Sequence, residues 1–132
     1  MNFSSLVLME RDKENNQFVK ELGSYQVNDG AEYITKMYYD GEKVHLFFDT
    51  RKDVEDWEYT AIFDLFNDSA FIESGYDIEN EDNEYNPTWH ITFDYIEEVN
   101  VMEEKLQRIC TLIKEQMEKV FKEIQGKQEE YK

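Results

Sequence analysis

The sequence predicts an α+β fold in which an antiparallel β-meander of about five to seven strands packs against one long C-terminal helix. Residues 1–98 are mainly short runs in which apolar or aromatic residues alternate with polar ones, separated by turn-forming residues. From residue 100 the apolar residues recur every three or four positions, which is the period of a helix. With 40% hydrophobic and 15% aromatic residues, the 132-residue chain has enough apolar material for the core of one domain over 1–132.

The first expected hairpin lies near the N-terminus. Residues 6–9 (LVLM) and 18–22 (FVKEL) are β-prone, and the turn-forming residues 13–16 (KENN) separate them. These two runs are therefore expected to pair as neighbouring antiparallel strands.

A second hairpin is expected within residues 33–49 (YITKMYYDGEKVHLFFD). Asp40 and Gly41 can supply the positive φ angles of a two-residue turn, and aromatic and β-branched residues flank them. A turn of that length would place Met37 opposite Val44 and Lys36 opposite His45.

Residues 54–66 fit two periods at once. Every second residue from 57 to 65 is apolar, as in a strand, whereas positions 54, 57, 61 and 65 lie on one face of a helix. A strand is favoured because aromatic residues suit a pleated surface, with Asp56, Glu58, Thr60 and Asp64 on its wet face.

Two further elements precede the C-terminal helix. Residues 68–74 (DSAFIES) predict one or two helical turns that stop at Gly75. Residues 88–96 (TWHITFDYI) alternate strictly and predict a strand, with Trp89 on its apolar face and His90 on its polar face.

The last element is an amphipathic helix over 100–126, with Asn100 as its N-cap and Glu103 at the third helical position. Its apolar stripe consists of Met102, Leu106, Ile109, Ile113, Met117, Val120 and Ile124. The favoured interpretation is that this stripe covers the chain's own sheet. The alternative is a heptad-like seam through which two copies form a homodimer. Residues 127–132 are expected to fray.

The negative charge is concentrated in one part of the chain. Residues 53–104 hold 17 of the 31 Asp and Glu residues and no Lys or Arg, whereas the remaining residues hold 14 acids and 14 bases. The formal net charge of −17 therefore belongs to this block. A chain that needed charge for solubility alone could scatter it evenly.

Metal and catalytic interpretations of the acidic stretch 75–89 (GYDIENEDNEYNPTW) are weak at the level of sequence. Counted from Asp77 as a calcium loop, position six is Asp82 rather than glycine, and position twelve is Thr88 rather than glutamate. Acids crowded on a loop are normally hydrated, so they lack the shifted pKa values of catalytic carboxylates. We expect no cofactor, no metal site and no enzymatic activity; the alternative is a carboxylate-lined divalent-metal site or weak hydrolase activity.

Other candidate catalytic or ligand residues are few. His45 and His90 stand far apart on predicted strands, and no close-spaced Cys or His pair offers a zinc site. Each histidine is expected to be a partly buried sheet residue. Cys110, beside Ile109 on the helix, is expected to be an inert core or flank residue rather than a nucleophile.

The charge distribution favours a non-catalytic interaction protein that binds a basic protein surface. The expected binding residues are Asp53, Glu55, Asp56, Glu58, Asp77, Glu79, Glu81, Asp82 and Glu84. In a sharper form of this hypothesis the acids imitate nucleic-acid phosphates and inhibit a DNA- or RNA-binding partner. Direct nucleic-acid binding is not expected, because phosphate recognition depends on Lys and Arg.

A cytoplasmic location is expected. The single Cys110 cannot form an intramolecular disulfide, and the first residues resemble no secretion signal. No membrane association is expected either, because the chain lacks a run of roughly 18 apolar residues and anionic membrane surfaces repel it.

Four segments carry a resemblance to a known family: LVLMERDKE, ELGSYQVNDGAEYITKMYYDGEKV, DVEDWEYTAIFDLF and YNPTW. They are similar to an uncharacterised family of small acidic bacterial proteins classed as a domain of unknown function. The resemblance covers most of the chain and implies a small non-secreted protein. It implies no activity and no functional residues.

Overall fold

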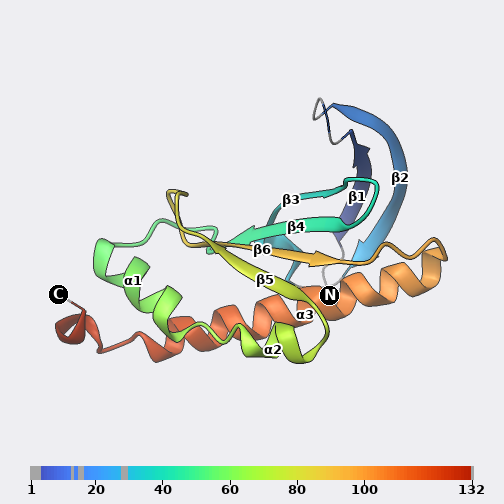
Figure 1. Cartoon of the computed structure of the whole chain (residues 1–132). Coiled ribbons are helices and arrows are strands. Elements are labelled where there is room, and N and C mark those ends of the chain that lie inside the picture. The colour runs from blue at the N-terminus through green and yellow to red at the C-terminus, as the bar shows by residue number, and fades with distance from the viewer. Residues whose placement is uncertain (1–3, 13, 15–16, 28–29, 132) are drawn as a thin grey trace.

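The computed structural model describes residues 4–12, 14, 17–27 and 30–131. It is an α+β structure with a six-stranded sheet and a long helix across one face (Figure 1). The strands are β1 (Ser4–Arg11), β2 (Phe18–Val27), β3 (Ile34–Tyr39), β4 (Val44–Asp49), β5 (Asp77–Glu81) and β6 (Thr88–Phe93). The helices are α1 (Asp56–Leu65), α2 (Ser69–Glu73), α3 (Val99–Glu123) and the short 3-10 helices η1 (Ala31–Tyr33) and η2 (Gln128–Glu130).

The sheet is mixed rather than a simple meander. Its strand order is β2-β1-β3-β4-β6-β5, and every described pair is antiparallel except β1 with β3. The expected first hairpin is confirmed as β1–β2, whose turn at 13–16 lies largely outside the described residues. The parallel seam is narrow, with Met9 beside Tyr38 and Glu10 beside Tyr39.

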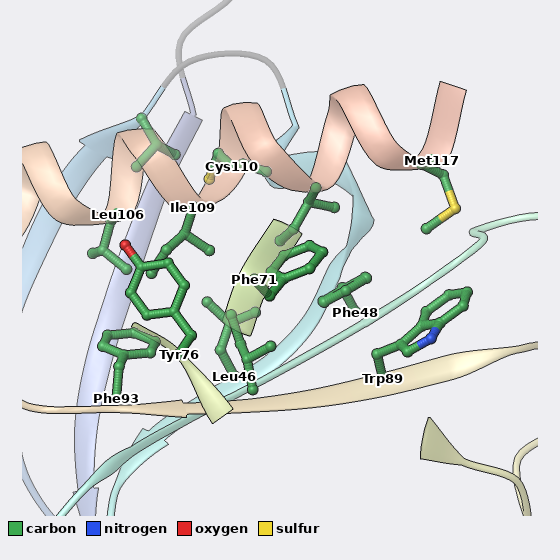
Figure 2. Packing of buried hydrophobic residues seen from close by; sticks show 14 of the residues in the cluster. Leu46, Phe48, Phe71, Tyr76, Trp89, Phe93, Leu106, Ile109, Cys110 and Met117 are labelled. Carbon is green, nitrogen blue, oxygen red and sulfur yellow. The ribbon is translucent and has the colours of Figure 1, made fainter. Parts of the chain in front are cut away.

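The core lies between α3 and one face of the sheet. Alternate residues of β4 and β6, such as Leu46, Phe48 and Trp89, point toward α3, and the aromatic rings stack on one another (Figure 2). The predicted helical stripe meets them: Met102, Leu106, Ile109, Ile113, Met117, Val120 and Ile124 are all at most 2% exposed. The stripe therefore covers the chain's own sheet, as the favoured interpretation expected.

The N-cap of α3 is Glu98 and not Asn100. The Glu98 carboxylate accepts hydrogen bonds from the backbone N–H groups of Asn100 and Val101, at 3.3 and 3.0 Å. A carboxylate at this position also interacts favourably with the positive end of the helix dipole. Asn100 is thus part of the first helical turn.

The strand predicted over 54–66 is wrong, because residues 56–65 form helix α1. In a strand Ile62 would share the wet face with Thr60 and Asp64, whereas the helix buries Ile62 completely. Local capping favours the helix too, since the Glu58 side chain accepts from the Glu55 backbone N–H at 2.9 Å. The sequence fits the helical and the strand period equally well, and the helix is favoured because it also buries Ile62.

The register predicted for the second hairpin is also wrong. The Asp40 carboxylate accepts from the N–H groups of both Glu42 and Lys43 at 2.8 Å, which makes a longer loop than the two-residue turn. Tyr39 consequently pairs with Val44, and Tyr38 pairs with His45. The shift matters because it sets the neighbour of His45.

The smaller expectations around the helices have mixed outcomes. The predicted helical turns are α2, and Gly75 follows it with a φ of 93°, as a stop signal should. Residues 127–132 were expected to fray, yet η2 forms there and the Tyr131 hydroxyl donates to the Asp64 carboxylate. That bond ties the described end of the chain to α1.

Replacing Ile113 by Asp should lower the free energy of unfolding by about 3 kcal/mol or more, because a carboxylate at a fully buried position loses its hydration without gaining a partner. Urea denaturation followed by circular dichroism measures the change. Thr111→Asp is the matched control, since Thr111 is exposed on the same helix and its replacement should cost about 1 kcal/mol or less. Equal losses in both variants would contradict the packing of α3 on the sheet.

Candidate functional site

The face of the sheet opposite α3 carries the polar residues of the strands. Along β4 and β6, His45, Phe47 and His90 alternate with the buried core residues and are only partly buried. In β5, Glu79 pairs with His90 and therefore projects from the same face. The acidic stretch 77–81 is thus an edge strand of the sheet and not the loop that its composition suggested.

A chain of close polar contacts crosses this face. His45 Nε2 lies 2.7 Å from Asp40 Oδ2, and His45 Nδ1 lies 2.7 Å from His90 Nε2. His90 Nδ1 in turn lies 3.4 Å from Glu81 Oε1. We call Asp40, His45, His90 and Glu81 the histidine relay.

Aromatic stacking fixes the two imidazole rings. Tyr38 stacks on His45 with centroids 5.0 Å apart, and Phe47 stacks on His90 at 4.2 Å and an interplanar angle of 15°. Cations cover the outer rings, because the Arg11 guanidinium lies over Tyr38 and the Lys36 ammonium lies over Phe47. The rings have little freedom to rotate out of the relay.

The ionised state of Asp40 sets the direction of the hydrogen bonds. Burial raises the pKa of Asp40, but the N–H groups of Lys43 and Glu42, together with His45, outweigh burial and lower this pKa to about 2. The carboxylate must therefore accept, so His45 Nε2 carries a hydrogen. When both rings are neutral, His45 Nδ1 accepts from His90 Nε2–H, and His90 Nδ1 is left with a lone pair toward Glu81.

The pKa of His90 is lowered. Burial is the largest cause and the adjacent His45 adds to it, while Glu81 and Glu79 oppose the shift. Since histidine ordinarily titrates near pH 6.5, the neutral ring prevails at pH 7.

Glu79, Glu81 and His90 form a converging group of possible ligands. One ligand atom from each lies within 4.8 Å of the others, with Glu79 exposed and the other two half-buried. Glu79 and His90 also line a pocket of about 510 Å³ together with His45, Asp77 and Thr92. Solvent and ions can therefore reach the group.

Of the nine predicted binding acids, Asp77, Glu79 and Glu81 lie on β5, Asp82 and Glu84 lie in the β5–β6 turn, and Asp53, Glu55, Asp56 and Glu58 lie in or just before the first turn of α1; we call these nine residues the acidic band. The Tyr59 hydroxyl is within hydrogen-bonding distance of the backbone carbonyls of Glu84 and Asp82, at 2.9 and 3.2 Å. These contacts hold the β5–β6 turn against α1, which carries Asp56 and Glu58. Segments more than twenty positions apart in the sequence thus lie close together.

The members of the acidic band differ in their environments. Asp53, Asp56, Asp77, Glu79, Asp82 and Glu84 are exposed. Glu55 and Glu58 cap α1, where Glu55 also accepts from the Trp57 indole N–H at 2.9 Å, and Glu81 belongs to the histidine relay. In the described part of the chain, the Lys43 and Arg108 ion pairs go to Asp94 and Glu104, outside the band.

The expected burial of Cys110 is confirmed, while the two histidines make contacts with each other that the sequence did not indicate. Cys110 is fully buried, and burial raises the pKa of its thiol to about 12. Both histidines are partly buried sheet residues, but their pairing was missed. The alternation of both strands placed His45 and His90 on polar faces and could have suggested that they share one. The sequence did not reveal that β4 and β6 are neighbours, so it could not bring the two rings together.

A larger pocket of about 640 Å³ lies between α3 and the segment that joins α2 to β5, lined by Ser74, Tyr76, Arg108 and Thr111 among others. Its Arg108 is already paired with Glu104 at 2.7 Å. The chemistry of this pocket is therefore less distinctive than that of the histidine relay.

Comparison with known proteins places the whole chain in one family. Residues 1–132 match the model described as "Family of unknown function (DUF6762)". The chain belongs to this family. No curated protein and no solved structure matches the chain. Membership in DUF6762 thus agrees with the resemblance found in the sequence and transfers no site residues.

Among the described helices of this DUF6762 protein, none combines the length and the apolar character that crossing a membrane requires.

Cys110 should remain unlabelled by a thiol-reactive chromophore at pH 8 in the native protein, because the thiolate is the reactive form and both burial and a pKa of about 12 suppress it. In denaturant the same thiol should react at once. Rapid labelling under native conditions would contradict its place in the core.

Tyr59→Phe should loosen the β5–β6 turn, because the variant keeps the ring but loses the hydroxyl contacts to the two carbonyls. Faster hydrogen exchange over residues 82–86 and a loss of about 1 kcal/mol in unfolding free energy are expected. Tyr85→Phe is the control, since that side chain is 79% exposed in the same turn and should change neither. Identical behaviour of the two variants would show that Tyr59 does not hold the turn.

Proposed function

We propose that this protein is a non-catalytic binding protein whose acidic band engages a Lys- and Arg-rich surface of another protein. The observation that carries the proposal is the attachment of the β5–β6 turn to α1 through Tyr59, which gathers acids from two distant segments. The charge of the band is uncompensated along the sequence from 53 to 104.

Electrostatic steering is the physical basis of this function. A surface of one sign attracts a partner of opposite sign during diffusion and raises the association rate, and salt weakens the effect because it screens charges over about 8 Å at physiological ionic strength. The exposed acids Asp53, Asp56, Asp82 and Glu84 are suited to this role because a partner can reach them from solvent. Glu55, Glu58 and Glu81 contribute charge but are also needed internally.

Exposure supports binding rather than acid–base chemistry in the band. A carboxylate that acts as a general acid or base usually needs shielding from water to shift its pKa. Mimicry of nucleic-acid phosphates is a sharper form of the same proposal, in which the partner's basic surface is a DNA- or RNA-binding channel.

The variant Asp53→Asn, Asp56→Asn, Asp82→Asn and Glu84→Gln should keep the fold and weaken capture of basic proteins from a lysate of the host. With a captured partner purified, the association rate should fall by about ten-fold or more at low salt, and its dependence on salt should flatten. Stopped-flow mixing over a series of salt concentrations measures both.

The matched control is Glu21→Gln, Glu115→Gln, Glu118→Gln and Glu129→Gln, which removes the same charge from exposed positions outside the acidic band. This control should bind nearly as the unaltered chain does. Equal effects of the two four-fold variants, or failure to capture any basic protein, would overturn the proposal.

A further inference from the structure

We propose that Glu79, Glu81 and His90 form a binding site for a divalent transition-metal ion of the Zn²⁺ class, with His45 and Asp40 orienting the histidine ligand. The site is distinct in chemistry from the exposed acids of the band, because it contains an imidazole. It does not depend on a protein partner.

The first argument is convergence. Strand pairing places Glu79 opposite His90 on one face of the sheet, and Glu81 reaches the same ring from two residues along β5. The ligand atoms of all three lie within 4.8 Å of one another. Two ligands of a tetrahedral zinc ion lie roughly 3.4 Å apart, given bond lengths near 2.1 Å. The contact between His90 Nδ1 and Glu81 Oε1 already has that spacing at 3.4 Å.

The second argument is the polarity of the histidine relay. When both rings are neutral, Asp40 accepts from His45 and His45 in turn accepts from His90 Nε2–H, so the His90 ring presents only a lone pair at Nδ1. That lone pair faces the acceptor oxygens of Glu81 and Glu79. Three acceptors therefore converge, namely the Nδ1 lone pair of His90 and the two glutamate carboxylates. A cation satisfies all three at once.

The third argument is the support behind the ligand. Metal-binding histidines almost always donate their other ring nitrogen to a further group, often a carboxylate system, which fixes the tautomer. Here His45 and Asp40 provide that support, and Phe47 stacks on His90 at 4.2 Å. The ring is thereby held with Nδ1 toward the two glutamates.

Donor type selects the class of metal. An imidazole nitrogen with two carboxylates suits zinc and its neighbours, whereas calcium prefers six to eight oxygen ligands. Three protein ligands leave a position for water, and the adjoining pocket of about 510 Å³ gives access to it.

The test is isothermal titration calorimetry of the untagged full-length chain with zinc chloride near pH 7.5 in a weakly coordinating buffer. One saturable site is expected. His90→Gln, which approximates the size of the ring, and Glu81→Gln should each weaken zinc binding by about ten-fold or more. Calcium chloride should give no comparable saturable binding. Circular dichroism confirms that each variant is folded.

Two controls keep the site separate from the acidic band. The variant Asp53→Asn, Asp56→Asn, Asp82→Asn and Glu84→Gln should bind zinc within about three-fold of the unaltered chain, because it leaves all three ligands in place. His45→Phe keeps a ring against Tyr38 but removes both hydrogen bonds, and should weaken binding by about ten-fold. Nitrogen-15 spectra should show Nδ1 of His90 as the metallated atom and a changed tautomer in His45→Phe.

Zinc binding that survives His90→Gln but falls in the four-fold acidic variant would show diffuse attraction to the band and overturn the site. The absence of saturable zinc binding would also overturn the site. In that case a proton shared between His90 and Glu81 would hold the two side chains together. Tighter binding of calcium than of zinc would overturn the assigned metal class. None of these results bears on capture of a basic protein, so the two proposals fail separately.

Discussion

The packing of α3 against one face of the sheet is the interaction on which the other features depend. Seven apolar side chains of one helix are buried against alternate residues of the strands, with the Phe48 and Trp89 rings stacked beneath them (Figure 2). Because successive strand residues point to opposite faces, this core fixes which residues lie on the other face. A one-residue slip of β4 or β6 would bury His45 or His90 and expose the core.

Much of the fold followed from periodicity, and the errors show where periodicity is insufficient. The stripe of α3 and the strand around Trp89 each satisfy one period only, so both were predictable. Residues 54–66 satisfy two, and the choice depended on Ile62 reaching a core that other segments supply. The hairpin register depended on the Asp40 side chain taking two backbone N–H groups, a local bond that residue type alone does not reveal.

The candidate sites were predictable to different degrees. The density of Asp and Glu residues along the sequence was enough to propose the acidic band. It could not reveal the Tyr59 contacts that hold the β5–β6 turn against α1. The histidine relay requires the strand order, since His45 and His90 meet only because β4 and β6 are neighbours while helices α1 and α2 and strand β5 intervene in sequence. Charged side chains on the edge strand β5 have a further effect, because they disfavour edge-to-edge pairing with another copy.

The narrow parallel seam between β1 and β3 has a consequence for motion. The β1–β2 hairpin joins the rest of the sheet through the pairs Met9–Tyr38 and Glu10–Tyr39, supplemented by contacts of Gln26 with Glu103 and Gln107 on α3. Antiparallel pairing within the hairpin is far more extensive, so an opening of the seam would move the hairpin as a unit, although Leu8, Tyr25 and Val27, each at most 1% exposed, oppose its separation because they belong to the core. Such an opening would lift Arg11 from Tyr38, the ring that stacks on His45. Local opening of the β1–β2 hairpin would therefore change the surroundings of His45.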